Sequence, residues 1–103
     1  MLTPAFDARV ERDAAAAVVV LEGDLDLATA DRFERAMSRA FELADTWSID
    51  ASALHFVDSS GVRALLRAHA EAQRRGGRLP VRGLDGSARA ALGHMDLLGL
   101  LEG

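Results

Sequence analysis

The sequence contains neither cysteine nor lysine, and each absence excludes a class of chemistry. Without cysteine the chain has no disulfides, no thiolate nucleophile and no cysteine-based zinc site, which fits a reducing compartment. The 12 residues counted as Lys or Arg are all arginine, so Schiff-base chemistry and the lysine of a phosphate-binding loop are excluded as well. We therefore expect no nucleotide hydrolysis by the usual phosphate-loop machinery.

Long hydrophobic runs and a surplus of positive charge are also missing. The longest apolar run covers residues 14–21, far short of the roughly 18 residues that a membrane-spanning helix needs. The first residues lack the basic-then-apolar order of a signal peptide. The net charge is −4, and no basic stripe with interleaved aromatic residues occurs. We expect a cytoplasmic protein that neither inserts into a membrane nor binds nucleic acid.

The hydrophobic pattern predicts a single α/β domain over residues 1–103. Alternation predicts a strand with one wet face at 6–12, and consecutive valines predict a buried strand that Gly23 ends. Further short strands are expected at 47–50, 54–57 and 78–82, the last at an edge or a bulge because Pro80 has no N–H. The sequence therefore supplies the strands of one sheet.

Apolar residues that recur at spacings of three and four predict the helices. One amphipathic helix of about four turns is expected after Thr29, a plausible N-cap. A second is expected from Gly61 to the arginines and glycines at 74–77, and a short third at 87–92. Strands that alternate with helices indicate the α/β class.

A pair of serines, Ser59 and Ser60, stands where the strand ending at Val57 gives way to a helix. The ordinary interpretation is that one of them is the N-cap of the helix. However, neither has Glu or Gln three residues later, so no capping box forms. Gly61 in the first turn costs up to about 1 kcal/mol relative to alanine, which indicates close approach by a partner or a phosphate. If the turn is ordinary helix, Gly61→Ala should preserve or raise stability.

Enzymatic interpretations find little support in the residues. The nucleophile elbow of serine hydrolases needs glycine two residues before the serine, where this chain has Val57 or Asp58. The histidines match no metal-binding motif, so we expect no metal or cofactor; they are His55, His69 and His94.

Acidic residues follow two of the predicted strands. Asp24 and Asp26 come after the buried strand, and Asp58 follows the strand before the serines. In α/β sheets, sites assemble at the C-terminal ends of strands. Asp24 and Asp26 are therefore either turn formers or contacts for a partner.

Together these segments resemble a known family over nearly the whole chain. GDLDLATADRF, DASALHFVDSSGVRALL, RRGGRLPVRG and the closing LLGLL resemble the STAS domain of bacterial anti-sigma factor antagonists. The step from Asp50 to Asp58 and the DSSG that follows are the most specific part. The resemblance implies a mixed sheet of four to five strands with helices mainly on one face.

The resemblance also implies a phosphorylation switch. The serine directly after the aspartate, here Ser59, is the one that the partner anti-sigma factor phosphorylates in that family. This partner is a serine kinase of the GHKL type, and a PP2C-type phosphatase restores the serine. The partner-binding residues implied here are Asp24, Asp26, Asp58, Ser60, Gly61 and Val62. Arg63 and Arg67 depart from the family pattern on the expected partner face.

We therefore predict a non-enzymatic anti-sigma factor antagonist, which frees a sigma factor when Ser59 is unphosphorylated. The alternative is a STAS accessory subunit of a membrane transport complex. A separate enzymatic activity ranks third.

Overall fold

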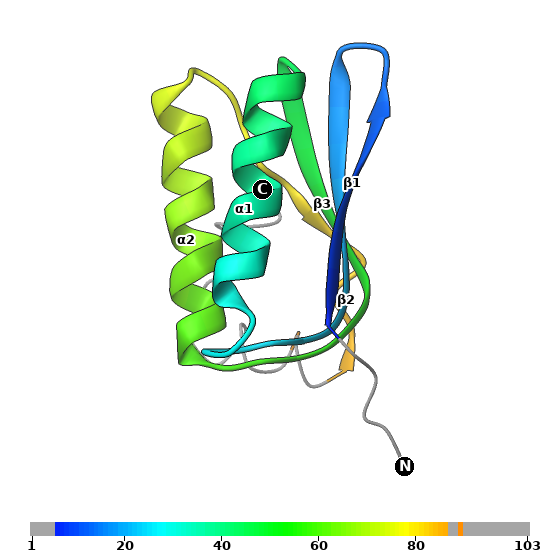
Figure 1. The fold of residues 1–103 in the computed structure, drawn as a ribbon, viewed down its shortest axis with the longest axis vertical. Coiled ribbons are helices and arrows are strands. Elements are labelled where there is room, and N and C mark those ends of the chain that lie inside the picture. Colours follow the sequence, from blue (N-terminus) through cyan, green and yellow to red (C-terminus); the bar gives the residue numbers. More distant parts are fainter. Residues whose placement is uncertain (1–5, 87–88, 90–103) are drawn as a thin grey trace.

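The computed structural model describes residues 6–86 and 89, which form a four-stranded sheet covered by two helices on one face (Figure 1). The elements in chain order are β1 (Asp7–Asp13), β2 (Ala16–Leu25), α1 (Ala30–Leu43), β3 (Thr46–Val57), α2 (Ser59–Arg74) and β4 (Val81–Arg82). The sheet order is β1-β2-β3-β4; β1 pairs antiparallel with β2, and the other two pairings are parallel. The predicted mixed α/β sheet is confirmed.

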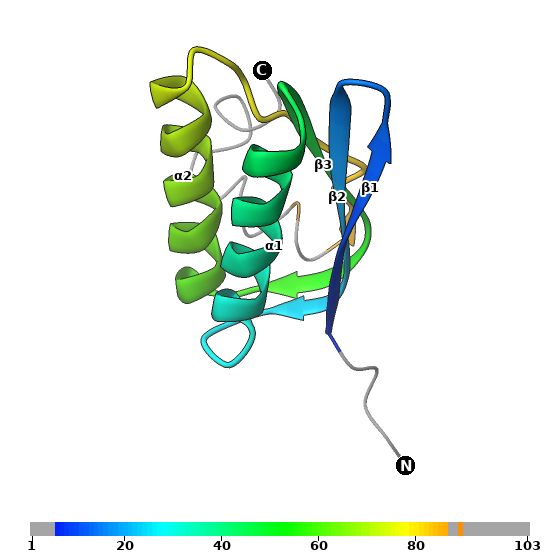
Figure 2. The same ribbon diagram turned by 45° about the horizontal axis from the view of Figure 1, so that its top comes forward.

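The predicted limits of β2 and β3 are wrong. β2 does not end at Gly23 but runs on to Leu25, because its pairing with β3 shifts on either side of this glycine and then resumes. Gly23 takes a positive φ of 87°, which a residue with a side chain adopts only at a cost. The segments at 47–50 and 54–57 belong to one strand, since the fully buried Ala51 joins the two halves. The longer strands bring the ends of β2 and β3 under the helices (Figure 2).

The core lies between the sheet and the two helices. Phe33, Met37 and Phe41 recur on one side of α1 and are buried, as the helical spacing predicts. Leu65 of α2 completes the layer together with buried residues of β2 and β3. Apolar burial of this kind is the main term that favours folding.

The last predicted strand is shorter than expected. Only Val81 and Arg82 pair with β3, after Pro80, whose carbonyl oxygen accepts a hydrogen bond from the Ile49 nitrogen at 2.9 Å. α2 ends at Arg74 and Gly76 follows with a φ of 83°, in agreement with the predicted end of the helix. The helix predicted at 87–92 and the closing LLGLL lie outside the described residues, except for Arg89.

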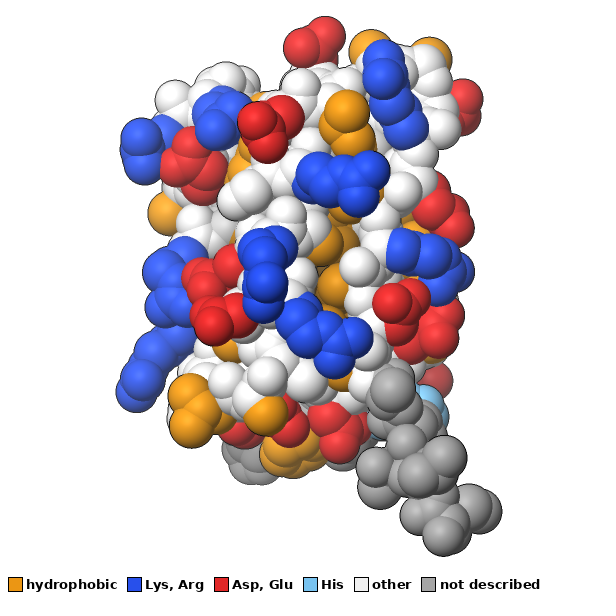
Figure 3. Space-filling model, in the orientation of Figure 1, with side chains coloured by type: hydrophobic (Ala, Val, Ile, Leu, Met, Phe, Trp, Pro, Cys, Tyr) orange, Lys and Arg blue, Asp and Glu red, His pale blue; other side chains and the backbone are white. Residues whose placement is uncertain are grey.

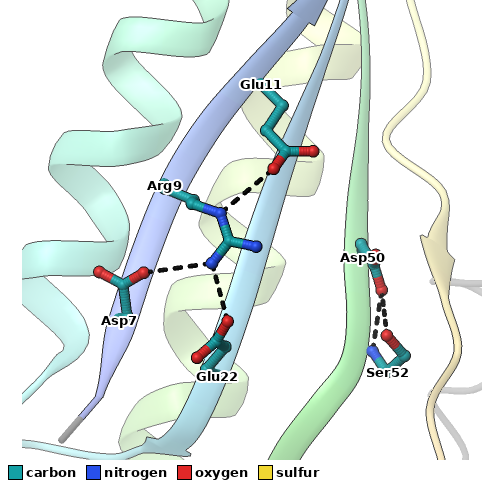
Figure 4. A network of polar contacts seen from close by, with 6 residues as sticks. All are labelled: Asp7, Arg9, Glu11, Glu22, Asp50 and Ser52. Atoms are coloured by element: carbon teal, nitrogen blue, oxygen red, sulfur yellow. Dashed lines mark hydrogen bonds and ion pairs between the residues drawn. The ribbon is translucent and has the colours of Figure 1, made fainter.

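The face of the sheet away from the helices carries charged side chains (Figure 4). Arg9 of β1 forms ion pairs with Glu22 at 2.7 Å, Glu11 at 3.2 Å and Asp7 at 3.4 Å. On β3, one carboxylate oxygen of Asp50 accepts hydrogen bonds from the Ser52 hydroxyl at 2.7 Å and the Ser52 nitrogen at 3.0 Å. These hydrogen bonds hold the pKa of Asp50 below its ordinary value, because they stabilise the ionised form.

Replacing Ser52 by alanine should raise the pKa of Asp50 toward its ordinary value, because the hydroxyl donor is lost and the backbone donor remains. A lowered native pKa contributes stability above the unfolded pKa, and this stability is lost as the pH falls through the native value. In Ser52→Ala the acid-induced loss should therefore be smaller and should be complete at a higher pH, while its onset near the unfolded pKa stays the same. Carboxyl chemical shifts followed through a pH titration measure the change; an unchanged Asp50 midpoint would contradict it.

Candidate functional site

The candidate site lies where β2 and β3 run into the helices. Leu25 pairs with Val57 and Asp24 with Phe56, so the ends of the two strands are neighbours in the sheet. The three acidic residues singled out in the sequence therefore come to one end of the molecule, as expected for neighbouring parallel strands.

Asp58 holds the two strand-to-helix loops together. One carboxylate oxygen accepts a hydrogen bond from the Gly61 nitrogen at 2.8 Å, which makes Asp58 the N-cap of α2. The other accepts from the Leu27 nitrogen, in the loop after β2, at 3.3 Å. The Asp58 nitrogen in turn donates to the Leu25 carbonyl oxygen at 3.2 Å.

Neither serine caps the helix, so the ordinary interpretation of the serines as an N-cap is wrong. Ser59 is the first residue of α2 and is exposed, and Ser60 is half-buried. Within the described part of the chain, neither hydroxyl forms a hydrogen bond. Because Asp58 caps the helix, the Ser59 hydroxyl remains available to react or to be recognised.

Gly61 is required by the protein's own packing. A Cβ atom at this position would collide with the carbonyl oxygen of Leu25 and would lie 2.9 Å from Val57 Cγ1. The group that approaches this bare backbone is therefore the end of β2, so the condition under which alanine was expected to be tolerated, an ordinary helical turn, is not met. Gly61 and Val62 are both buried, so neither offers surface to another protein in this structure.

Asp24 and Asp26 have different surroundings. The Asp26 carboxylate accepts hydrogen bonds from the Ala28 and Thr29 nitrogens at 3.0 and 3.2 Å, so it forms the turn before α1. The Asp24 side chain is exposed and forms no such turn; only its backbone oxygen accepts, from the Thr29 hydroxyl at 2.8 Å. Thr29 is the residue before α1 as predicted, but its side chain bonds this loop and does not cap the helix.

Two exposed apolar side chains at this end were missed in the sequence. Leu27 is 78% exposed and Phe56 is 45% exposed. Figure 3 shows hydrophobic and acidic side chains close together at the lower end of the molecule. Leu27 fits neither the strand alternation nor the helical spacing around it, and this was the available signal. Leu27, whose nitrogen bonds Asp58, and Phe56, which pairs with Asp24, thus place exposed apolar side chains at the end of the molecule that holds these acidic residues.

Arg63 and Arg67, which depart from the family pattern, also have different surroundings. Arg67 pairs with Glu34 of α1 at 2.7 Å, so it links the two helices. Arg63 is exposed, one helical turn after Ser59.

Within residues 6–86 and 89 there is no group of three or more His, Asp or Glu side chains that could hold a metal ion. The same residues include no helix that is long and apolar enough to cross a membrane.

Comparison with known proteins gives the class of this fold and site. Residues 8–102 match the family model described as Mlab, STAS domain, and the chain therefore belongs to the STAS domain family. No curated protein matches the sequence.

Solved anti-sigma factor antagonists share the fold. One from Mycobacterium paratuberculosis is 22% identical with a TM-score of 0.79; the alignment covers 97% of this chain and 87% of that one. Unphosphorylated SpoIIAA is 25% identical with a TM-score of 0.75, and the alignment covers 96% and 86% of the two chains. The resemblance stated from the sequence is confirmed.

A transporter protein has the same fold as well. A sulfate transporter family protein from Wolinella succinogenes is 18% identical with a TM-score of 0.73, over 86% of this chain and 73% of that one. The fold alone therefore serves both regulators and transporters.

Gly61→Ala should lower the free energy of unfolding by about 1–3 kcal/mol, because overpacking against the β2 backbone outweighs the gain of up to about 1 kcal/mol in helix propensity. Urea denaturation measures the change. Ser60→Ala, one residue earlier in the same turn, is the matched control and should stay within about 0.5 kcal/mol of the wild type. A Gly61→Ala protein as stable as Ser60→Ala would contradict this prediction, because it would mean that the end of β2 moves aside for the added Cβ atom without a cost in stability.

Asp58→Ala should cost about 0.5–2 kcal/mol of stability, because the Gly61 nitrogen and the Leu27 nitrogen both lose their acceptor. Asp58→Asn retains an oxygen at the cap and should lose less, about 0.3–1 kcal/mol, from the missing charge at the positive end of the helix. Thermal unfolding of the two variants separates the effects. Equal losses would mean that charge, and not the hydrogen bond, makes Asp58 stabilising.

Proposed function

We propose that this chain is an anti-sigma factor antagonist, and that phosphorylation of Ser59 switches its binding to an anti-sigma factor serine kinase. The observation that carries the proposal is the exposed Ser59 hydroxyl at the start of α2, left unused because Asp58 caps the helix. A hydroxyl needed for the cap could not be modified without loss of helix stability. This one can.

The start of α2 can accept a phosphate. The nitrogen of Gly61 is bonded to Asp58, but the first two nitrogens of the helix have no partner within the described residues. Together with the positive end of the helix dipole, they favour an anion on Ser59. Arg63, one turn later, can pair with the phosphate at the i, i+4 spacing. The phosphorylated protein should therefore stay folded.

The surroundings of Ser59 suit a partner that meets a neutral serine. Leu27 supplies an exposed apolar side chain and Asp24 an exposed carboxylate at the same end of the molecule. A phosphate on Ser59 adds about −1.5 to −2 charges at pH 7. A partner docked here would have to desolvate that charge, and a buried polar group without a partner costs about 1–3 kcal/mol, more when charged. The modified surface should release the kinase.

The proposed cycle follows the family. The unphosphorylated chain holds a GHKL-type kinase and so frees a sigma factor, the kinase phosphorylates Ser59 and is released, and a PP2C-type phosphatase restores the serine. In this proposal Asp26, Asp58, Gly61 and Val62 shape the surface from within, while Ser59, Ser60, Asp24 and Leu27 meet the partner. The chain itself has no enzymatic role in the cycle.

Variants of the two serines test the switch against a GHKL-type anti-sigma kinase of the same organism. Ser59→Ala should bind the kinase and resist phosphorylation. Ser59→Asp should fold but bind at least about five- to a hundredfold more weakly. Ser60→Ala is the control and should still gain a single phosphate in intact-mass analysis. Phosphate on Ser59→Ala, or equal kinase affinity of the Ala and Asp variants, would overturn the assignment.

A second candidate is an accessory subunit of a membrane transport complex. It is supported by the likeness to the Wolinella succinogenes transporter protein, and murine Slc26a9, an anion transporter, contains a similar unit at 18% identity and a TM-score of 0.69. Affinity capture from native cells distinguishes the two: recovery of a permease or its ATPase, with no phosphate on Ser59, would favour the transport function.

A further inference from the structure

A groove of about 460 Å³ lies between β1 and α1, along the edge of the sheet. Its floor is apolar and includes Ala8, Val10 and Ala36. Four of its seven lining residues are arginines and none is acidic, although the whole chain has a net charge of −4. Figure 3 shows basic side chains on both sides of a hydrophobic strip between α1 and β1. This groove is separate from the surface around Ser59.

Two of the four arginines are already engaged. Arg32 donates to the Phe6 carbonyl oxygen at 2.6 Å and lies over the Phe6 ring, and Arg9 is paired with three carboxylates. Arg35 contacts only a backbone oxygen, that of Asp31, at 3.4 Å. Arg39 has no hydrogen bond or ion pair with any described residue. Arg35 and Arg39 therefore bring two positive charges to the groove without a carboxylate partner.

The strand that borders the groove is an open edge. β1 is the first strand in the sheet order and pairs only with β2 among the described strands. Asp13 pairs with Ala16 across a two-residue turn, and antiparallel bonding alternates from there. The backbone N–H and C=O groups of Ala8 and Val10 therefore point away from β2, while their side chains pack toward the helices. Such an edge can accept another strand.

The spacing of the free arginines matches an extended chain. Arg35 and Arg39 are four residues apart on α1, a rise of about 6 Å. Side chains on one face of a strand repeat roughly every 6.6–6.8 Å. Alternate residues of a strand added to β1 would thus meet the two arginines in turn.

We propose that this groove binds an extended acidic segment of a partner protein, which adds to the edge of β1 and places alternate carboxylates on Arg35 and Arg39. Main-chain hydrogen bonds to β1 supply affinity, and the arginine-carboxylate pairs select the acidic side chains. The open face of the sheet, next to this edge, carries the carboxylates of Asp7, Glu11 and Glu22 (Figure 4). They repel an anionic membrane or a nucleic acid, whereas an added strand turns its alternate carboxylates to the opposite face, toward Arg35 and Arg39.

The probe for this site is a short fluorescein-labelled peptide in which glutamate alternates with threonine, added to the full chain and followed by fluorescence anisotropy. Binding should weaken as the ionic strength rises, since the Debye length is only about 10 Å at 0.1 M salt. A peptide with the same number of glutamates at every third position should bind at least about tenfold more weakly, because neighbouring glutamates then lie on opposite faces of the strand. N-methylation of alternate peptide nitrogens should cause a similar loss.

Charge reversal on the protein tests the arginines. Arg39→Glu and Arg35→Glu should each weaken binding at least about tenfold. Arg78→Glu makes the same change at an exposed position outside the groove and should leave the affinity unchanged, as should Ser59→Asp. Equal binding of the alternating peptide and the peptide with glutamate at every third position, or equal loss in Arg78→Glu, would overturn the proposal. So would Arg39-dependent binding of phosphatidylglycerol vesicles or single-stranded DNA with no binding of the alternating peptide.

Discussion

The close approach of α2 to the end of β2 is the constraint on which the rest of the site depends. Gly61 lies against the Leu25 carbonyl, where no side chain fits, and the Asp58 carboxylate bonds Gly61 and Leu27 at once. Because one residue caps the helix and fastens the neighbouring loop, the first turn of α2 is held without its serines. The fold thus presents a hydroxyl that contributes nothing to its own stability.

The surface charges are divided among separate regions of the molecule. One group of carboxylates lies at the end of the molecule near Ser59. Another group pairs with Arg9 on the open face of the sheet. The groove between β1 and α1 is lined by arginine. The net charge of −4 is a sum over the whole chain and does not show this separation of charges. Net charge is therefore a poor guide to the charge of a partner, because short-range pairing decides each contact.

The site could be predicted in part. That Asp24, Asp26 and Asp58 meet at one end followed from the position of acids after parallel strands. The roles of individual atoms could not be predicted. The N-cap of α2 is Asp58 and not a serine, and the Asp26 carboxylate accepts hydrogen bonds within the turn before α1. Both depend on which N–H group lies within about 3 Å of an oxygen, a distance that residue order does not contain.

Local sequence by itself determined the α/β class, the helical faces and the position of the strand-to-helix junction, because hydrophobic periodicity and turn residues act over a few neighbours. The tertiary structure decided what depends on contacts between distant segments. Pairing with β3 carried β2 past Gly23, burial joined the two halves of β3 through Ala51, and the Leu25 backbone made Gly61 indispensable. It also brought arginines of α1 beside the open edge of β1, since helix and strand meet only when the chain has folded.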